Sequence, residues 1–135
     1  MRIGTVSVLV DDQEKARRFY TEKLGFQVKH DIDVGGALWL TVVSPEDPDG
    51  AEILLEPDWN PEVPAKAWKQ ALFEKGMPVV VLNVTDVRAE YSRLRGLGVA
   101  FQSEPSEQSG VTMATFDDTC GNYVMIAGGQ VRRTA

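Results

Sequence analysis

Residues 8–26 read VLVDDQEKARRFYTEKLGF, and this stretch decides the fold of the 135-residue chain. Val8 and Val10 alternate with less apolar neighbours, which is the pattern of a β-strand with one buried face. Asp12 can cap a helix that follows, because its short side chain accepts a hydrogen bond from the first helical turn. Gly25 then suits the end of that helix. The stretch therefore predicts a strand followed by a helix.

The same pattern occurs again at residues 81–99, which read VLNVTDVRAEYSRLRGLGV. The segment at 8–12 matches LNVTD at 82–86, and LGF at 24–26 matches LGV at 97–99. A shift of one residue inside the helix brings the two matches into one alignment. A repeat of this length with two copies indicates a duplicated module rather than a solenoid. The alternative is a coincidence between two short strand-helix segments.

Alternation and turn residues predict further strands around these two units. In the first half they lie at 26–32, 38–43 and 51–56, and in the second half at 99–102, 111–116 and 122–127. We therefore expect one domain over residues 1–135, with module one at 1–57, a linker with a short helix at 58–77, module two at 78–130 and a frayed tail at 131–135. In the linker helix, Trp68 is expected to anchor packing and Lys69 to lie on the charged face.

The net charge and the numbers of cysteine and histidine residues exclude several classes of function. The chain has 20 acidic and 14 basic residues, a net charge of −6 and a pI of about 4.8, so we expect neither nucleic acid nor anionic membrane as a partner. A single cysteine, Cys120, excludes an intramolecular disulfide, and a single histidine, His30, excludes a two-imidazole metal centre within one chain. No signal peptide or membrane span is recognisable, so a cytoplasmic location is expected.

Three segments resemble the vicinal oxygen chelate superfamily, which includes glyoxalase I, bleomycin resistance proteins and extradiol dioxygenases. Two are the stretches at 8–26 and 81–99, and the third is FDDTCGNYVMI at 116–126, which is similar to the D-P-x-G-N segment of the family. The resemblance spans nearly the whole chain. It implies an α+β fold in which two tandem βαβββ modules form an open barrel-like sheet around a cleft.

The resemblance also implies where metal-dependent members hold their ion, on the first and fourth strands of each half. The matching positions are Thr5, Glu52, Val79 and Met125. Only Glu52 suits a hard cation, because Val79 has no donor atom and Met125 offers a soft thioether. His30, Asp31 and Asp33 form another cluster of candidate ligands, Glu56 shares the strand face of Glu52, and His30 could meet Glu52 across strands. These residues predict no resident metal and no other cofactor.

The bleomycin resistance proteins are therefore the model that the resemblance favours. They sequester a drug in grooves formed at a dimer and perform no chemistry. We expect a homodimer that binds a small apolar or cationic organic molecule. The expected ligand-binding surface comprises Thr5, Ser7, Trp39, Glu52, Leu54, Glu56, Val79, Val81, Asn83, Tyr123 and Met125.

Two other classes stay open. One is an enzyme, a lyase, isomerase or dioxygenase-like member, in which Glu52 acts as general base or as a ligand of a metal completed by unusual or intersubunit donors. The other is a structural or regulatory dimer module. Trp39 could stack on a planar ligand, pack in the core or lie at a dimer contact. Trp59 belongs to a segment that could form a lid or an interface, and Cys120 has no assignable base beside it.

Overall fold

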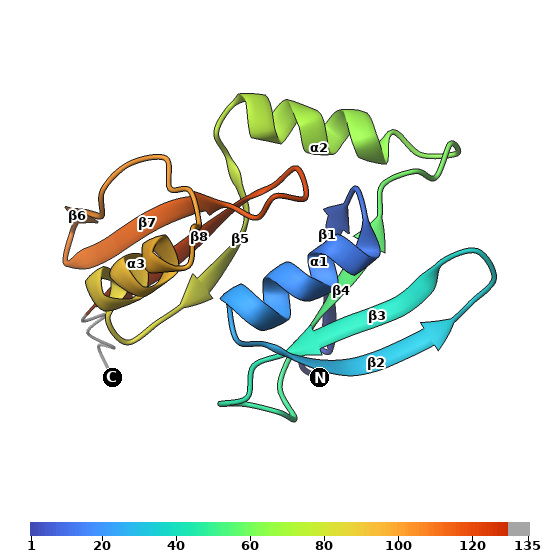
Figure 1. Ribbon diagram of the computed structural model, residues 1–135, viewed down its shortest axis with the longest axis horizontal. Coiled ribbons are helices and arrows are strands. Elements are labelled where there is room, and N and C mark those ends of the chain that lie inside the picture. The colour runs from blue at the N-terminus through green and yellow to red at the C-terminus, as the bar shows by residue number, and fades with distance from the viewer. Residues whose placement is uncertain (130–135) are drawn as a thin grey trace.

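The computed structural model describes residues 1–129, and these form two βαβββ-like modules (Figure 1). The first module contains β1 (Thr5–Val10), α1 (Gln13–Arg18), a π-helical turn (Phe19–Lys23), β2 (Gln27–Asp33), β3 (Leu38–Val43) and β4 (Glu52–Pro57). After α2 (Ala65–Glu74), the second contains β5 (Pro78–Asn83), α3 (Val87–Gly96), β6 (Ser106–Gln108), β7 (Val111–Asp117) and β8 (Tyr123–Gly129). Residue 130 of the expected second module and the expected tail lie outside the described residues.

Each module builds a four-stranded mixed sheet, and the two sheets have equivalent strand orders, β1-β4-β3-β2 and β5-β8-β7-β6. The first and last strands of each module pair in parallel, and the remaining pairs are antiparallel. Thr5 is thereby paired with Glu52, and Val81 with Met125. The α+β fold of two βαβββ-like modules is confirmed.

The predicted helix starts and ends are present in both copies. Asp12 and Asp86 are the N-caps of α1 and α3, and the side chain of each accepts a hydrogen bond of 3.0 Å from the backbone N–H three residues later. Gly25 and Gly98 follow the two helical segments with φ values of 81° and 87°, a conformation that glycine adopts without steric cost.

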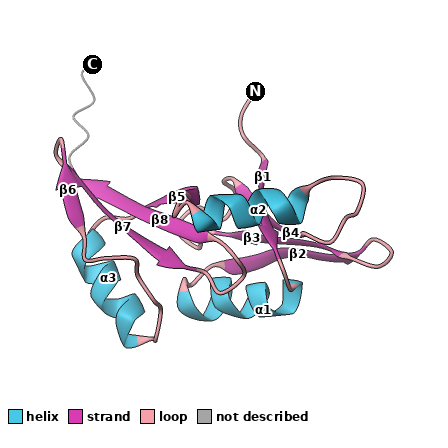
Figure 2. Ribbon diagram, turned by 90° about the horizontal axis from the view of Figure 1, so that it is seen from above, coloured by secondary structure: helices cyan, strands magenta, loops and turns pink. Residues whose placement is uncertain are grey.

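One apolar core runs through both modules. Figure 2 shows α1 and α3 on the same side of the layer of sheets and α2 on the opposite side. Val8 and Val10 of β1 are buried in the same core as Ala16 of α1, and Phe19 and Phe116 join the modules with ring centroids 6.0 Å apart. The alternation expected for the first strand is present at Val8 and Val10, which are buried, and at Ser7, which is exposed, whereas Val6 is 39% exposed although it was expected on the apolar face. None of the helices within residues 1–129 combines the length and apolar character that crossing a bilayer requires.

The strand expected at 99–102 is wrong, because the segment makes only an isolated bridge between Phe101 and Phe116. The Phe101 ring turns into the core, where it packs edge-on against Tyr91 at 4.7 Å and Phe116 at 5.5 Å. Pro105, which has no N–H to donate, then interrupts the chain before the three-residue strand β6. The fourth strand of the second sheet therefore begins later than its counterpart β2.

The expected orientation of the linker helix is also wrong. Trp68 is 62% exposed, whereas Lys69 is 7% exposed and lies 2.9 Å from the carboxylate of Asp58. Successive helical residues point about 100° apart, so turning Lys69 toward Asp58 turns Trp68 away from the sheets. The packing contact of α2 is instead Phe73, whose ring stacks on Tyr123 with centroids 4.4 Å apart and 3° between planes.

Candidate functional site

The expected ligand-binding residues lie in two groups, one on each sheet. The first group occupies the face of the first sheet that points away from α1: Thr5, Ser7, Trp39, Glu52, Leu54 and Glu56. The second group lies on β5 and β8: Val79, Val81, Asn83, Tyr123 and Met125. The four positions that resemble the family's metal ligands are therefore divided between the sheets. Thr5 is paired with Glu52 on the first sheet, whereas Val79 and Met125 lie on the second sheet, where the strand partner of Met125 is Val81.

The centre of the first group is the Glu52 cluster, which we define as Glu52, Thr41, His30 and Lys29. Thr41 Oγ1 donates a hydrogen bond of 2.8 Å to Glu52 Oε1. His30 Nε2 lies 3.5 Å from the same oxygen, and Lys29 Nζ lies 3.7 Å from Oε2. The Glu52 side chain is only 16% exposed, so these neighbours replace much of its hydration. The expectation that His30 meets Glu52 across strands is confirmed.

Local sheet geometry explains how four polar side chains gather here. Thr41 and Leu54 are paired, so the open faces of β3 and β4 coincide. His30 is paired with Thr41, and the register shifts between Val28 and His30, which is the irregularity of a β-bulge. A bulge re-aims side chains that regular alternation would send to opposite faces, and it brings consecutive Lys29 and His30 to one carboxylate.

Trp39 gives this face an aromatic surface beside the cluster. It precedes Thr41 by two residues on β3 and so shares its face, about 7 Å farther along the strand. The residue is 41% exposed and lies near the turn between β2 and β3, where it is paired with Ile32 of β2. Leu54, at 8% exposed, supplies an apolar floor. The exposed surface at this point is therefore mainly the Trp39 ring, and the largely buried Leu54 and the hydrogen-bonded carboxylate of Glu52 lie farther along the same face.

The donor atoms at the four family positions do not fit a resident divalent cation. Val79 has none, Met125 has a thioether, and the carboxylate of Glu52 is already shared by a hydroxyl, an imidazole and an ammonium group. Throughout residues 1–129, no three or more His, Cys, Asp or Glu side chains are grouped so that they could hold a metal ion.

The second group is partly covered by α2. Phe73 lies flat on the Tyr123 ring, so one face of that ring is already occupied. Val81 is 53% exposed and Asn83 is also exposed, so the uncovered part of this group lies along β5.

Thr41 and Lys29 were not among the site residues predicted from the sequence. Alternation along the strand could have identified Thr41, which shares the face of Trp39. Lys29 depends on the bulge, which carries no clear sequence signal.

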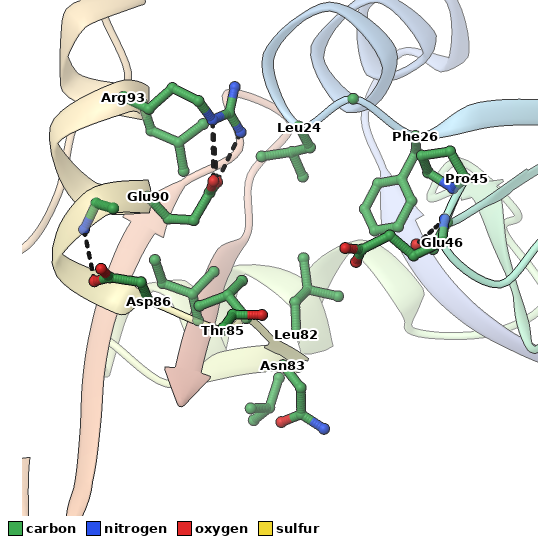
Figure 3. Close-up of a pocket in the computed structure, with 17 residues that line it drawn as sticks. Leu24, Phe26, Pro45, Glu46, Leu82, Asn83, Thr85, Asp86, Glu90 and Arg93 are labelled. Carbon is green, nitrogen blue, oxygen red and sulfur yellow. Dashed lines mark hydrogen bonds and ion pairs between the residues drawn. The ribbon is translucent and has the colours of Figure 1, made fainter. Parts of the chain in front are cut away.

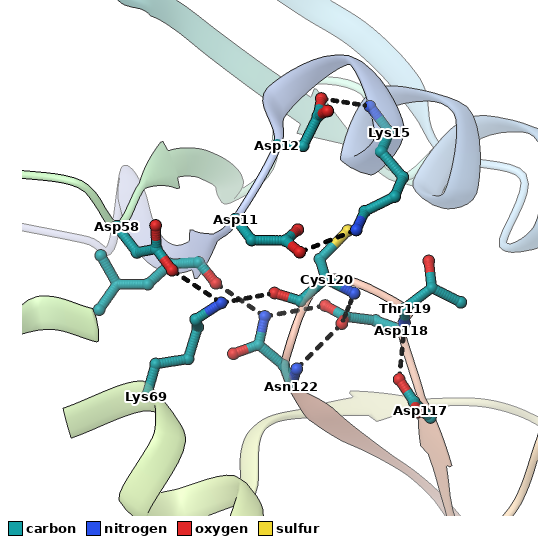
Figure 4. A network of polar contacts seen from close by, with 11 residues as sticks. Asp11, Asp12, Lys15, Asp58, Lys69, Asp117, Asp118, Thr119, Cys120 and Asn122 are labelled. Atoms are coloured by element: carbon teal, nitrogen blue, oxygen red, sulfur yellow. Dashed lines mark hydrogen bonds and ion pairs between the residues drawn. The ribbon is translucent and has the colours of Figure 1, made fainter. Parts of the chain in front are cut away.

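A buried polar network joins the modules at the segment resembling D-P-x-G-N (Figure 4). Asp118 Oδ2 accepts hydrogen bonds from Tyr20 Oη at 2.7 Å and Asn122 Nδ2 at 2.9 Å, and Oδ1 accepts from the backbone N–H groups of Cys120 and Asn122. Asn122 Nδ2 also donates to the Leu9 carbonyl at 2.7 Å. Burial raises the pKa of the Asp118 carboxyl, and the hydrogen bonds from Tyr20 and Asn122 oppose that shift.

Lys69 adds α2 to the same network. Its Nζ donates to the Cys120 carbonyl at 2.8 Å and forms the ion pair with Asp58, at the end of β4. Burial raises the pKa of the Cys120 thiol to about 12, and the side chain is fully buried. A thiol in that state is a poor nucleophile, so the network has a structural role that positions the two sheets.

Comparisons with known proteins agree with this architecture. The sequence model of the Glyoxalase/Bleomycin resistance protein/Dioxygenase superfamily matches residues 2–126. The uncharacterized proteins YurT and YetH of Bacillus subtilis (strain 168) are 47% and 34% identical to the chain over 126 residues. Each alignment covers 93% of this chain, together with 98% of YurT and 96% of YetH.

Solved structures resemble the chain over almost its full length. UcmS2 superposes with a TM-score of 0.82 at 36% identity, and the match covers 94% of this chain and 97% of UcmS2. TnmS3, described as an antibiotic binding protein from Streptomyces sp. CB03234, superposes with a TM-score of 0.76 at 29% identity. That match covers 96% of this chain and 97% of TnmS3.

Proposed function

The chain belongs to the Glyoxalase/Bleomycin resistance protein/Dioxygenase superfamily, and from that premise we propose that it binds a small organic molecule without a resident metal. The observation that carries the proposal is the open face of the first sheet, where the exposed ring of Trp39 lies beside the Glu52 cluster. The similarity to TnmS3, an antibiotic binding protein, supports the same class of function. The proposal needs no cofactor and places the protein in the cytoplasm, where a lone reduced cysteine is ordinary.

The chemistry of this face suits a planar molecule that carries a positive charge. Trp39 offers a stacking surface, and Leu54, the strand partner of Thr41, lies two residues farther along the same face. The carboxylate of Glu52 can receive a ligand ammonium if Lys29 moves aside. The Lys29 ammonium is the most distant neighbour of Glu52, at 3.7 Å, and it keeps a hydrogen bond of 3.2 Å to the Pro48 carbonyl if it moves away from the carboxylate. The net charge of −6 favours cations in the same sense.

We further propose that the protein is a homodimer whose second copy completes the site. In the first group, Thr5, Ser7, Trp39 and Glu56 are exposed in a single chain. Ligand pockets normally bury most of the surface of their ligand, and a single open sheet face does not do so. A facing sheet from a second copy would supply the other wall, including residues of the second group on β5 and β8.

An enzyme that uses Glu52 as a general base is the second candidate. The observation in its favour is the approach of His30 Nε2 to the Glu52 carboxylate at 3.5 Å, which gives that face two groups able to exchange protons with a substrate. Mass spectrometry of a bound compound after release distinguishes the candidates. A binding protein returns the compound unchanged, whereas an enzyme returns a product.

The proposal is tested by titrating bleomycin, 9-aminoacridine and its uncharged analogue acridone into the protein and following tryptophan fluorescence. We expect saturable binding that favours 9-aminoacridine over acridone. Trp39→Ala should weaken binding of 9-aminoacridine by about tenfold, the effect of about 1.4 kcal/mol of lost stacking. Trp68→Ala is the matched control, because Trp68 is exposed on α2, and it should bind like the unaltered protein. Equal affinity in all three proteins, or no binding of any compound, would contradict the proposal.

A further inference from the structure

A pocket lies where the two modules meet, and it includes none of the residues of the Glu52 cluster (Figure 3). It has a volume of about 900 Å³. One wall comes from the first module, at residues 24–26 and 44–46, and the other comes from β5 and α3 of the second module. Of the expected ligand-binding residues, only Val81 and Asn83 reach it.

The floor of this module-junction pocket is apolar and belongs to the core. Leu94 and Ile126 are 1% and 2% exposed, so they are held in place by packing on their other sides. Phe26 and Leu82 pack against the same core from the two modules. A volume of this size on a preformed apolar floor is typical of sites for small organic ligands.

The rim carries an excess of negative charge. Glu90 is paired with Arg93, whose Nη2 lies 2.8 Å from its Oε2. Glu46, on the opposite wall, makes no ion pair within residues 1–129, and Figure 3 shows its carboxylate directed into the space between the modules. Asp86 also borders the pocket, with its carboxylate turned toward the N-terminus of α3, so three acidic residues and one arginine lie around the rim.

Arg93 lies at one end of the pocket, and its guanidinium group is already bound by other residues of the protein. Its Nη1 donates to the Lys23 carbonyl of the first module at 3.0 Å, and its Nε and Nη2 are bound to Glu90. The N-terminus of α3 would otherwise attract an anion, but its cap is the carboxylate of Asp86. The pocket therefore disfavours anionic ligands.

We propose that the module-junction pocket is a second ligand site, distinct from the open sheet face, that takes a small organic cation with a compact apolar body. The apolar body lies on Phe26, Leu82 and Leu94, and the ammonium group lies between the carboxylates of Glu46 and Glu90. This site stands on its own geometry and does not depend on the function proposed for the Glu52 cluster. Because its walls belong to different modules, a bound cation also links the modules.

The test uses 1-adamantylamine as the probe and 1-adamantanecarboxylate as its oppositely charged analogue. These compounds have no planar ring to stack on Trp39, and the signals of the pocket's own residues report binding there. In amide NMR spectra of the full chain, the amine should shift the signals of Leu82, Ala89 and Leu94 saturably, and the carboxylate should not. No shift with the amine at millimolar concentration, or equal shifts with both compounds, would overturn the proposal.

Single substitutions then test whether Glu46 binds the ammonium group and whether the amine occupies the cavity. Glu46→Gln should weaken amine binding by about fivefold, as expected for the loss of one partly exposed charge contact. Glu62→Gln, an exposed acid outside the pocket, is the control for the change in net charge and should bind normally. Ala89→Phe fills the cavity from the exposed side of α3 and should abolish binding, whereas Arg88→Phe on the same helix, outside the pocket lining, should not.

The two proposed sites can be tested independently of each other. Trp39→Ala should leave the affinity for 1-adamantylamine unchanged, and Glu46→Gln should leave the response to 9-aminoacridine unchanged. If Trp39→Ala instead weakens the amine as strongly as Glu46→Gln does, the two probes share one site and the second site does not exist.

Discussion

At the scale of single residues, the ion pair of Lys69 and Asp58 is the feature whose removal should cost most stability. Both side chains are at least 93% buried, and Lys69 Nζ also satisfies the Cys120 carbonyl. Lys69→Ala leaves the Asp58 carboxylate buried without a cation, so we expect a loss of about 3–5 kcal/mol in the free energy of unfolding. Urea denaturation measures this loss directly.

Lys66→Ala is the matched control for that prediction. Lys66 lies on the same helix and is exposed, so its removal should change stability by less than about 0.5 kcal/mol. The double variant Lys69→Met with Asp58→Asn should recover part of the loss, because it removes both charges together. A Lys69→Ala protein as stable as Lys66→Ala would contradict the role assigned to the pair.

Cys120 gives a prediction about reactivity and pH. Burial raises the pKa of its thiol from an ordinary 9.0 to about 12, so the folded chain holds this proton more tightly than the unfolded chain. The stability that Cys120 contributes is complete below pH 9 and is lost as the pH rises through about 12. The thiol should resist dithiobis(nitrobenzoate) in the native protein and react at once in urea. Rapid labelling of the native protein would show that the thiol is accessible.

Alternation along the strands was enough to predict that Glu52 faces away from α1 and lies within reach of His30. It could not predict Lys29, because the bulge in β2 that turns Lys29 toward Glu52 has no reliable signature in one sequence. Helical spacing also placed Lys69 on the charged, solvated face of the linker helix, and this prediction was wrong. A lysine on an amphipathic helix is usually solvated, and its partner Asp58 is brought near only by tertiary packing.

At the scale of elements, α2 is held to the second sheet by the stack of Phe73 on Tyr123. Phe73→Ala should lower the free energy of unfolding by about 1–2 kcal/mol, through the lost stacking and apolar burial. It should also accelerate hydrogen exchange along α2 more than in α3, since only α2 depends on this ring. Trp68→Ala on the exposed side of the same helix should leave exchange in α2 unchanged, and equal acceleration in both variants would contradict this account.

The ends of a helix could be predicted from the sequence where one residue, such as a capping aspartate, determines where the helix begins. Asp12 and Asp86 cap their helices as expected because capping is a local interaction. The π-helical turn after α1 was not predicted, since it serves tertiary packing. There Phe19 and Tyr20 are 6% and 0% exposed although they are adjacent, and the wider turn allows both rings to reach the core. The missing strand at 99–102 has a similar cause, because the half-buried ring of Phe101 packs against Tyr91 and Phe116.

At the scale of the whole molecule, the internal repeat allowed the architecture to be predicted almost completely. Two strand-helix units with matching caps and terminating glycines imply two equivalent modules, and both sheets have the same strand order. The contacts that join the modules were not predictable, because Tyr20 with Asp118 and Asn122 with Leu9 are each about a hundred positions apart in the chain. The ligand could not be predicted either, since this fold supports many functions.

The proposed assembly is tested by the mass of the protein in solution. If a second copy completes the site, analytical ultracentrifugation should give twice the chain mass of 14.9 kDa at micromolar concentration. Addition of 9-aminoacridine should shift any residual monomer toward the dimer, because the ligand contacts both copies. A monomer that binds the compound with one site per chain would refute the shared site.

The measurement that tests the central claim most directly is calorimetric titration of 9-aminoacridine into the protein before and after exhaustive treatment with EDTA. The account predicts the same affinity in both samples, within about twofold, because the ring of Trp39 and the carboxylate of Glu52 bind the ligand without an ion. Addition of Zn²⁺, Ni²⁺, Mn²⁺ or Fe²⁺ should not change it. Binding that disappears with EDTA and returns with one of these metals would contradict the claim of a metal-free binding protein.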